Sequence, residues 1–503
     1  MRSMDLPHDI AAWLRESVTG TLQCDSRRLQ PGDGFVAWPG AATDGRRYVN
    51  DALASGAVAA LVELDGVEAF GLADPRVLAV PGLKTKAGAI ASAFFDQPSA
   101  ELDVLAITGT NGKTSCAWWT AQLLSVCARP CAVVGTLGMG QPGTSLTPTG
   151  LTTPDPVMLH QQLRSFADEG LKACAIEASS IGLVEGRLNA TQVRVAVFTN
   201  FTQDHLDFHG SMDAYWEAKA ALFDWPGLAS AVVNIDDIQG QKLATRLVSQ
   251  ALDLWTVGIE SPARLNAVDV ELTHAGMVFA VVERDAQGKE LDRHSLQVPL
   301  AGRYNVSNLL CVLASARALG VSLQQAVKAC GAFTPVPGRM EQAEAATPDQ
   351  PLVLVDYAHT PDALAKALHA LQPLATRRGG ALWVVVGCGG DRDAGKRPLM
   401  AAVAEREAAH AVLTSDNPRG EDPVHILGQM LVGLTNAGAV LVEPDRAAAI
   451  AMTVARAQAA DVVLIAGKGH EDYQDIQGVK TPFSDLVHAR QALTARAAQG
   501  ASA

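Results

Sequence analysis

The stretch ITGTNGKTS, residues 107–115, decides the fold of the central part of the chain. It follows the apolar run Val104–Ile107 and precedes an apolar-periodic stretch that begins near Cys116. This pattern predicts a strand, a glycine turn and a helix. Backbone N–H groups of such a turn bind phosphate oxygens, a lysine neutralises their charge, and a Ser/Thr hydroxyl binds Mg²⁺. The pattern therefore predicts a nucleoside triphosphate site.

The match to the phosphate-loop consensus is incomplete. The pattern GxxxxGK[ST] places glycine where this chain has Ile107, so only the core from Gly109 to Thr114 is present. A chance Gly-Lys turn is the alternative. The strand before the turn and the helix after it favour the phosphate site.

Short β-branched runs alternate with helical patterns from residue 104 onward, which predicts a parallel sheet with crossover helices. Residues 268–283 instead alternate apolar and polar side chains around Ala275-Gly276, which predicts a hairpin, and helices are expected at 304–319 and 322–331. The expected strands of this sheet are 104–108, 131–137, 172–178, 193–199 and 230–234.

The length of 503 residues favours about three domains. Two prolines and a glycine in Thr334–Gly338 predict a boundary, and a second alternating series follows it. We expect an α/β protein of three domains: a small N-terminal α/β domain (1–100), a central phosphate-loop ATPase domain with a parallel sheet (101–335), and a C-terminal Rossmann-like doubly wound domain (336–503). The N-terminal elements are expected at 34–38, 48–55 and 57–63, and the C-terminal strands at 352–356, 381–387, 410–414, 439–443 and 461–466.

Composition restricts the class of protein. Hydrophobic residues make up 48% and charged residues 18%, which is typical of a globular chain. The net charge of −13 argues against a general nucleic-acid or membrane-surface binder. The eight cysteines form no CxxC pair, the N-terminus has no signal-peptide apolar core, and the longest apolar runs have strand length. We expect a soluble cytoplasmic protein with reduced thiols and no membrane span.

Polar residues follow several predicted strands of the central part. Glu177 ends one strand, where a Mg²⁺ ligand and a simple cap are equally good interpretations. Residues 199–210 place Asp204, His205, Asp207 and His209 within six positions, which fits either a turn network or a hard-cation site. Lys219 lies in an amphipathic helical pattern that by itself predicts a solvated surface lysine.

Three charged turns follow strands in the C-terminal part: GCGGDRDAGKRP (387–398), TSDNPRGEDP (414–423) and AGKGHEDYQ (466–474). Carboxyl ends of strands in a doubly wound sheet share one edge, where ligands bind. Arginine suits a carboxylate, whereas Asp, Asn or Glu suits an ammonium. The turns therefore favour a small amino-acid-like ligand over unrelated surface decoration.

Taken together, these segments resemble the Mur ligase family along nearly the whole chain. The ordered motifs are GTNGKT, TTPD, EASS, NFTQDHLDFHG, GRYNVSNLL, PGRME, DYAHTPDAL, GCGGDRDAGKRP and DNPR. Family members use ATP to add amino acids to peptidoglycan precursors. The DNPR turn at 416–419 is similar to that of members adding meso-2,6-diaminopimelate to UDP-N-acetylmuramoyl-L-alanyl-D-glutamate. The resemblance implies these substrates, an acyl-phosphate intermediate, and a role in cell-wall synthesis, cell shape and division. Nothing in the sequence demands more than a monomer, which is the state we expect.

The resemblance also implies roles for residues of the central domain. Lys113, Glu177, His205 and Lys219 would be catalytic. Two Mg²⁺ ions would be held by Thr114, Glu177, His205 and Lys219, with Lys219 carbamylated to N6-carboxylysine. The implied ATP-binding residues are Gly109, Thr110, Asn111, Gly112, Lys113, Thr114, Ser115, Asn305, Asn308, Arg339 and Asp356.

Both remaining substrates have implied positions as well. The muramoyl peptide would contact Ser26, Ala41, Ala42, Thr43, Thr152, Thr153, Ser179, Glu185 and Arg187. Diaminopimelate would contact Arg392, Asp416, Asn417, Pro418, Arg419, Gly467 and Glu471. The chain departs from the family pattern at Ile181, where the motif SSHGL has histidine, at Glu185, often glutamine, and at Leu151, often asparagine.

Two other functions share parts of this pattern. A folylpolyglutamate synthetase-like ligase has the phosphate loop and the lysine helix, but we expect it to lack residues 1–100 and the DNPR turn. A non-catalytic nucleotide switch needs the phosphate loop but not three convergent amino-acid turns.

Overall fold

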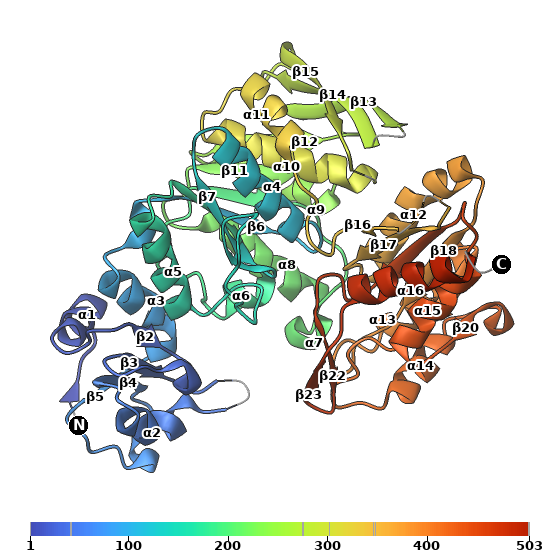
Figure 1. Ribbon diagram of the computed structural model, residues 1–503. Helices are drawn as coiled ribbons and strands as arrows, with labels where there is room; N and C mark the ends of the chain where they lie inside the picture. Colours follow the sequence, from blue (N-terminus) through green and yellow to red (C-terminus); the bar gives the residue numbers. More distant parts are fainter. Residues whose placement is uncertain are drawn as a thin grey trace.

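The computed structural model describes residues 2–40, 43–273, 276–300, 302–345, 347 and 349–500. Its strands form three main sheets, which we call the N-terminal, central and C-terminal sheets (Figure 1). All three carry helices on their faces, so the predicted α/β class is confirmed.

The N-terminal sheet is five-stranded and parallel, in the order β1-β5-β4-β3-β2. Apolar residues cover both of its faces, as expected for parallel strands that helices cover. Its elements are β1 (Arg2–Ser3), α1 (Pro7–Arg15), β2 (Leu22–Gln23), β3 (Gly34–Ala37), α2 (Val49–Ala54), β4 (Ala59–Glu63), β5 (Val77–Val80) and α3 (Leu83–Phe94).

The central sheet has ten strands in the order β15-β14-β13-β12-β11-β10-β6-β9-β7-β8. Strand β6, which leads into the phosphate turn, lies between β10 and β9 and pairs with both in parallel. The strands are β6 (Asp103–Thr108), β7 (Cys131–Gly135), β8 (Gly138–Gly140), β9 (Ala173–Glu177), β10 (Val195–Phe198), β11 (Ser230–Asn234), β12 (Asp253–Gly258), β13 (Leu265–Thr273), β14 (Gly276–Arg284) and β15 (Glu290–Val298).

Helices α4 (Lys113–Val126), α10 (Arg303–Ala318) and α11 (Leu323–Ala329) pack on one face of the central sheet, and α5 (Pro156–Asp168) and α9 (Ile238–Leu247) on the other. Three short helices follow strand ends: α6 (Ser180–Val184), α7 (Leu206–His209) and α8 (Met212–Ala220). The predicted hairpin is present as β13 and β14, although Ala275 lies outside the described residues. The third antiparallel strand, β15, was not predicted.

The C-terminal sheet has the order β16-β17-β21-β18-β19-β20 and is parallel except for the edge strand β16. A separate hairpin, β22 with β23, follows it. The elements are β16 (Glu341–Ala343), β17 (Leu352–Asp356), α12 (Pro361–Arg378), β18 (Leu382–Val386), α13 (Lys396–Glu407), β19 (His410–Leu413), α14 (Pro423–Leu431), β20 (Leu441–Val442), α15 (Arg446–Arg456), β21 (Val462–Ala466), β22 (Tyr473–Ile476), β23 (Val479–Pro482) and α16 (Asp485–Gly500).

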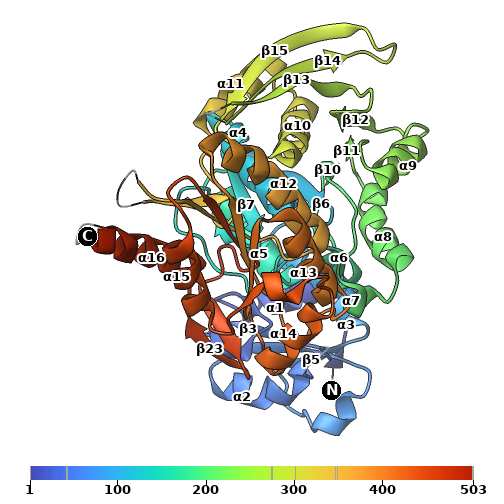
Figure 2. The ribbon, with the colours of Figure 1, turned by 90° about the vertical axis from the view of Figure 1, so that its right-hand side faces the viewer.

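The N-terminal sheet lies at one end of the molecule and β13–β15 at the other, in both views (Figures 1 and 2). Helix α3 packs against α5, and Lys84 forms an ion pair with Glu185 at 2.6 Å, so the N-terminal and central parts adjoin directly. Over the described residues, no helix is both long enough and apolar enough to cross a membrane.

Candidate active site

The phosphate turn joins β6 to α4, as its sequence predicts. Gly109 has φ +140°, and a Cβ there would lie 2.0 Å from Thr199 Oγ1. Gly112 has φ +87°, and a Cβ would lie 2.4 Å from Asn308 Oδ1. Both positions therefore require glycine, because any side chain would clash and strain the backbone. The N-terminus of α4 faces the turn and offers N–H groups to an anion.

Lys113 folds back over this turn. Its Nζ donates to the carbonyls of Gly109 at 2.9 Å and Thr110 at 2.8 Å. Burial lowers the pKa of Lys113, while the nearby Glu177 acts in the opposite direction. An anionic phosphate at the turn would offer this ammonium a better partner than two carbonyls.

Glu177 lies at the end of β9 and contacts Thr114, the residue that follows Lys113. Thr114 Oγ1 donates to Glu177 Oε2 at 2.9 Å, and the backbone N–H of Thr136 donates to Oε1 at 2.8 Å. Arg339, from the segment before β16, donates to Thr114 Oγ1 at 2.9 Å. A carboxylate and a hydroxyl in contact, at the edge of a phosphate turn, form an oxygen-rich set that suits Mg²⁺.

The structure places Lys219 in the interior, so the prediction of a surface lysine is wrong. Only 1% of the residue is exposed, and its Nζ donates to the Gly109 carbonyl at 2.8 Å. The ammonium also lies 4.4 Å from the centre of the Tyr215 ring. Burial, reinforced by the charge of Lys113, holds the pKa of Lys219 well below its usual value. The helical pattern could not reveal this, because the end of α8 packs against another element.

Asp204 follows β10 of the central sheet and lies close to two side chains of the C-terminal part. Asp204 Oδ2 lies 3.4 Å from His205 Nε2 and 3.7 Å from His359 Nε2, and Oδ1 lies 4.0 Å from Lys396 Nζ. Burial acts to raise the pKa of Asp204, but the hydrogen bond from His359 and the nearby His205 and Lys396 outweigh it and hold the pKa below its usual range. Burial lowers the pKa of His205 to about 4, so its ring is neutral near pH 7.

Three of the predicted ATP-binding residues lie at the start of α10 or the end of β17, namely Asn305, Asn308 and Asp356. Asn308 Nδ2 donates to Asn305 Oδ1 at 3.1 Å, and both side chains are buried. Asp356 accepts backbone N–H groups from Met340 and Ala358, at 2.8 Å each. Burial raises the pKa of Asp356. Asn308 contacts the phosphate turn through Gly112, so these residues adjoin the nucleotide site.

The predicted muramoyl-peptide residues divide into two groups. Thr153, Ser179 and Arg187 form one network beside Glu177: Thr153 Oγ1 donates to the Glu177 carbonyl at 2.7 Å and lies 2.9 Å from Ser179 Oγ, and Arg187 donates to the Thr153 carbonyl at 3.1 Å. Thr152 accepts a hydrogen bond from Thr136 Oγ1 at 3.1 Å.

The other group lies apart from that network. Ser26 begins a short turn capped by Asp25, and Thr43 Oγ1 lies 3.4 Å from the Tyr48 hydroxyl. Ala41 and Ala42 lie outside the described residues. Glu185, an expected substrate contact, forms the ion pair with Lys84.

The three charged turns of the C-terminal half meet at one sheet edge, as predicted. Arg419 Nη1 donates to the Gly390 carbonyl at 2.9 Å, and Asn417 Nδ2 donates to Glu471 Oε2 at 2.7 Å. A Cβ at Gly467 would lie 2.6 Å from Asp416 Oδ2, so this glycine permits close approach of two turns. Arg419 itself has φ +50°, a strained conformation typical of functional turns.

Two further residues that we expect to bind diaminopimelate, Arg392 and Pro418, differ in burial. Arg392 is exposed and donates to the Asp391 carbonyl, whereas Pro418 is buried behind Gly390, where a Cβ would lie 1.8 Å from the Pro418 carbonyl.

Thr136 lines the site and was not singled out from the sequence. Lys396, Lys468 and His470 belong to the charged turns that the sequence pointed to, but none of them was assigned a role. His470 is packed 5.4 Å from the Tyr357 ring, and burial lowers its pKa to about 4. In the described ranges no group of three His, Cys, Asp or Glu side chains converges as a ready metal site. Any Mg²⁺ would therefore need hydroxyl, phosphate or modified-lysine oxygens in addition to Glu177 or His205.

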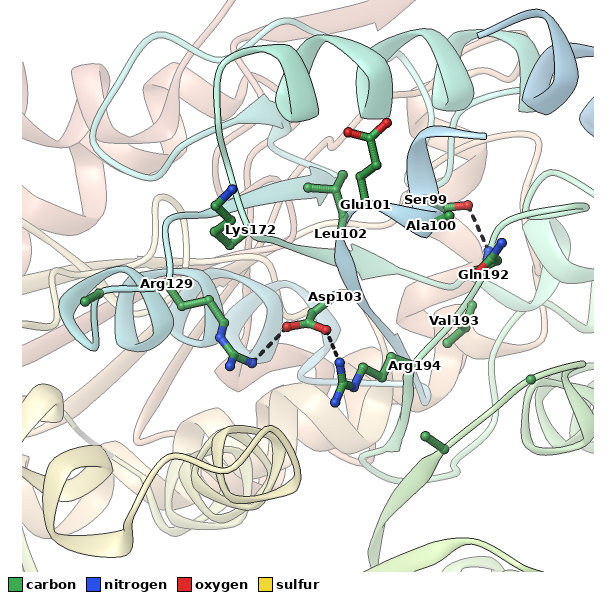
Figure 3. Close-up of a pocket in the computed structure, with 13 residues that line it drawn as sticks. Ser99, Ala100, Glu101, Leu102, Asp103, Arg129, Lys172, Gln192, Val193 and Arg194 are labelled. Carbon is green, nitrogen blue, oxygen red and sulfur yellow. Dashed lines mark hydrogen bonds and ion pairs between the residues drawn. The ribbon is translucent and has the colours of Figure 1, made fainter. Parts of the chain in front are cut away.

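A cavity of about 600 Å³ lies elsewhere, at the amino-terminal end of β6 (Figure 3). Asp103 sits within it between Arg129 at 2.8 Å and Arg194 at 2.6 Å. Both arginines are therefore already paired with a carboxylate. None of the predicted site residues lines this cavity.

Comparison with known proteins identifies the family. Three family models match: the Mur ligase family catalytic domain at residues 20–96, the Mur ligase middle domain at 107–316 and the Mur ligase glutamate ligase domain at 338–469. The chain belongs to the Mur ligase family. It is thus an ATP-dependent ligase.

Individual relatives agree with this. A protein of Acidovorax sp. (strain JS42), named UDP-N-acetylmuramoyl-L-alanyl-D-glutamate–2,6-diaminopimelate ligase, is 59% identical over 96% of both chains. One of the same name from Janthinobacterium sp. (strain Marseille) is 46% identical over 98% of both. A solved structure of a ligase with this name is 37% identical, covers 95% of each chain and has a TM-score of 0.63.

More distant structures share the fold. A MurF ligase from Thermotoga maritima in complex with ADP is 18% identical, covers 96% of this Mur ligase and 99% of that chain, and has a TM-score of 0.66. A folylpolyglutamate synthase from Mycobacterium tuberculosis is 19% identical, covers only 76% of this chain and 92% of its own, and has a TM-score of 0.60.

Proposed function

We propose that this Mur ligase joins meso-2,6-diaminopimelate to UDP-N-acetylmuramoyl-L-alanyl-D-glutamate at the expense of ATP. The observation that most directly supports this proposal is the DNPR turn, in which Arg419 and Asn417 contact the two other charged turns. The 59% identity to a relative named for this reaction supports the same assignment. The product would be used in peptidoglycan synthesis, and the enzyme would act in the cytoplasm.

In the proposed reaction, the γ-carboxylate of the D-glutamyl residue attacks the γ-phosphorus of ATP, which forms an acyl phosphate and releases ADP. The amine of diaminopimelate then attacks the acyl carbon, and the tetrahedral intermediate expels phosphate. Activation is needed because a carboxylate at neutral pH is a poor electrophile. The chain contributes mainly by positioning the reactants and neutralising their charge.

Lys113 and Arg339 are the cations placed for this task. Lys113 sits on the phosphate turn, and Arg339 reaches Thr114 from the C-terminal side of the chain. Lys113 would exchange its two carbonyl partners for phosphate oxygens when ATP binds. Arg339 would hold the C-terminal part near the transferred phosphoryl group. Positioned charges of this kind lower the barrier because they need no reorganisation during the reaction.

The residues present fit two Mg²⁺ ions. Thr114 and Glu177 would hold one, and His205 with a carbamylated Lys219 would hold the second. Bound Mg²⁺ would polarise phosphoryl oxygens and neutralise developing charge. A lysine must be neutral to react with CO₂, and burial lowers the pKa of Lys219, which favours the neutral amine. Its amine would bond to the carbon of CO₂ and release one proton, giving an anionic oxygen donor.

The amino-acid pocket would use both kinds of charge. Arg419 and Arg392 would pair with a carboxylate of diaminopimelate, and Asp416, Asn417 and Glu471 would receive an ammonium group. Lysine has an ammonium where diaminopimelate has its second amino-acid centre, so it would leave an arginine unpaired. The three sheets support a division of labour in which residues 1–100 bind the uridine end, 101–335 bind ATP, and 336–503 bind the amino acid.

The test is product analysis. Purified protein is incubated with UDP-N-acetylmuramoyl-L-alanyl-D-glutamate, ATP, Mg²⁺ and either diaminopimelate or lysine, and the nucleotide products are separated and weighed by mass spectrometry. We expect a tripeptide product with diaminopimelate and ADP release that depends on the amino acid. Equal ADP release with and without the amino acid would refute coupled ligation.

A further inference from the structure

Three cationic side chains lie fully buried beneath the charged turns of the C-terminal sheet. We call residues 387–398, 414–423 and 466–474 the first, second and third turns. Arg397 and Arg446 are 1% exposed and Lys468 is 0% exposed. A buried cation is tolerated only when it is paired and hydrogen-bonded. Each of the three has one carboxylate partner: Glu421, Asp485 and Glu471 respectively.

Arg397 joins the first turn to the second. It donates to Glu421 through Nη1 at 2.8 Å and Nη2 at 2.7 Å, and to the Gly389 carbonyl at 3.1 Å. Glu421 in turn accepts the backbone N–H of Asp391 at 2.6 Å. This fixes the Gly389–Gly390 segment on which the Arg419 guanidinium rests.

Arg446 joins the second turn to the third. It begins α15 and is held by Asp485 of α16, with two contacts of 2.7 Å. Its remaining donors reach the carbonyls of Ser415 at 3.1 Å and Ala466 at 2.9 Å. These carbonyls follow β19 and end β21, so the guanidinium sets the distance between the two strand ends.

Lys468 acts closest to the pocket. Its Nζ donates to Asn417 Oδ1 at 2.9 Å and to Glu471 Oε2 at 3.1 Å. The backbone N–H of Asp475 also donates to Asn417 Oδ1, at 3.0 Å. An ammonium group only donates hydrogen bonds, so it fixes the amide of Asn417 with its oxygen inward and its NH₂ toward Glu471. The same contact fixes Oε2 of Glu471, and among the described residues Oε1 accepts no hydrogen bond.

We propose that Lys468 is a positioning residue for the amino-acid substrate, and that with Arg397 and Arg446 it forms a frame that sets the spacing of the three turns. Lys468 presents the NH₂ of Asn417 and the Oε1 of Glu471 in the orientation that a zwitterionic amino acid needs. The ammonium itself stays below the pocket and does not touch the substrate. This inference rests on the proposed function, since it assigns the residues that hold that function's amino-acid pocket in shape.

The test compares Lys468→Met, Lys468→Gln and a matched control, Lys480→Met, in steady-state ligation assays. Lys480 is exposed on β23, and its ammonium also lies over the Tyr473 ring, at 4.2 Å against 5.5 Å for Lys468. Losing hydrogen bonds from a buried charge should raise the KM for diaminopimelate about 10- to 100-fold in Lys468→Met, with the KM for ATP within about twofold of the wild-type value. Lys468→Gln keeps an N–H donor for Asn417 and should fall between wild type and Lys468→Met. Lys480→Met should match wild type.

Thermal unfolding and the KM for ATP show whether each variant is folded. The proposal is overturned if the KM for diaminopimelate in Lys468→Met stays within about threefold of wild type. It is equally overturned if both KM values rise together with a lower unfolding temperature, or if neither Lys468 variant folds, because Lys468 is then only a structural residue of the domain. Failure of the wild-type enzyme to ligate diaminopimelate would instead refute the proposed function.

Discussion

Replacing Lys219 with methionine should lower kcat strongly while changing the free energy of unfolding only slightly. Among the residues that the structure describes, the Lys219 Nζ makes one hydrogen bond, to the Gly109 carbonyl, and that carbonyl also accepts from Lys113. Methionine has a similar length, fills the same space and brings no charge to desolvate. The variant loses one hydrogen bond, worth about 1 kcal/mol, and part of that loss is offset because no amine has to be buried.

Catalysis should respond far more strongly. If Lys219 carries the carbamate that helps to hold the second Mg²⁺, the variant lacks an anionic oxygen ligand next to the phosphate turn. Removing one preorganised electrostatic contact of this kind costs about 3–4 kcal/mol, or about 100- to 1,000-fold in kcat. We therefore expect a free energy of unfolding within about 1 kcal/mol of wild type together with a loss of more than about 100-fold in kcat.

The assays are urea unfolding, ligation kinetics over a Mg²⁺ titration, and carbon-13 NMR of protein equilibrated with labelled bicarbonate. Wild type should show a carbamate signal that Lys219→Met lacks, and Lys242→Met, at an exposed position of α9, should behave as wild type in all three measurements. A variant that keeps kcat within about tenfold of wild type, with an unchanged Mg²⁺ dependence, would refute the role of Lys219.

Three further predictions follow from the geometry. Arg419→Ala should raise the KM for diaminopimelate about 10- to 100-fold with the KM for ATP nearly unchanged, in steady-state kinetics, because a charge-assisted pair is lost; an equal rise of both would indicate a folding defect. Asp204→Asn removes the carboxylate that faces His359 and Lys396, so solution scattering with ATP bound should show a more extended particle than wild type, and an identical profile would contradict this. His160 is fully buried with a pKa lowered to about 4 by burial, so below about pH 6.5 the unfolded state binds a proton that the folded state does not, and stability falls by up to about 1.4 kcal/mol per pH unit down to about pH 4. Urea midpoints of His160→Leu should fall less steeply over that range, and equal slopes would contradict the assignment.

The sequence predicted the parallel strands of the central and C-terminal sheets because buried β-branched runs carry a strong local signal. The phosphate turn was predictable for a similar reason, since Gly109 and Gly112 each occupy a position that only glycine tolerates. Strand β15 was missed, because its sequence ELDRHSLQV is mostly polar and its exposed residues give no core pattern. Its place depends on pairing with β14, which is a tertiary feature.

Charged residues were the least predictable part of the site. Lysine and arginine are rarely buried, so a pattern of local sequence assigns them to the surface. Lys219, Arg397, Arg446 and Lys468 are nevertheless almost fully buried. Several of their partners lie far away in sequence: Arg446 pairs with Asp485, 39 residues later, Lys219 reaches Gly109, 110 residues earlier, and Lys468 reaches Asn417, 51 residues earlier. Glu185 is a similar case, because its partner Lys84 lies in α3 of the N-terminal part, 101 residues earlier.

In the proposed function, the carboxyl ends of the central and C-terminal sheets would carry different halves of the chemistry, and a few side chains join these two ends. Arg339 bonds to Thr114, Asp204 faces His359, and Asn111 donates to Asp362 at 3.3 Å. Each contact pairs a residue next to the phosphate turn with one from the C-terminal part. An acyl phosphate is easily hydrolysed, so the amine must reach it while water is kept out. These contacts hold the C-terminal part against the phosphate turn. Asp204, His359 and Asp362 have no assigned role in ATP binding, so we expect variants of these three to lower ligation more than they lower ATP binding.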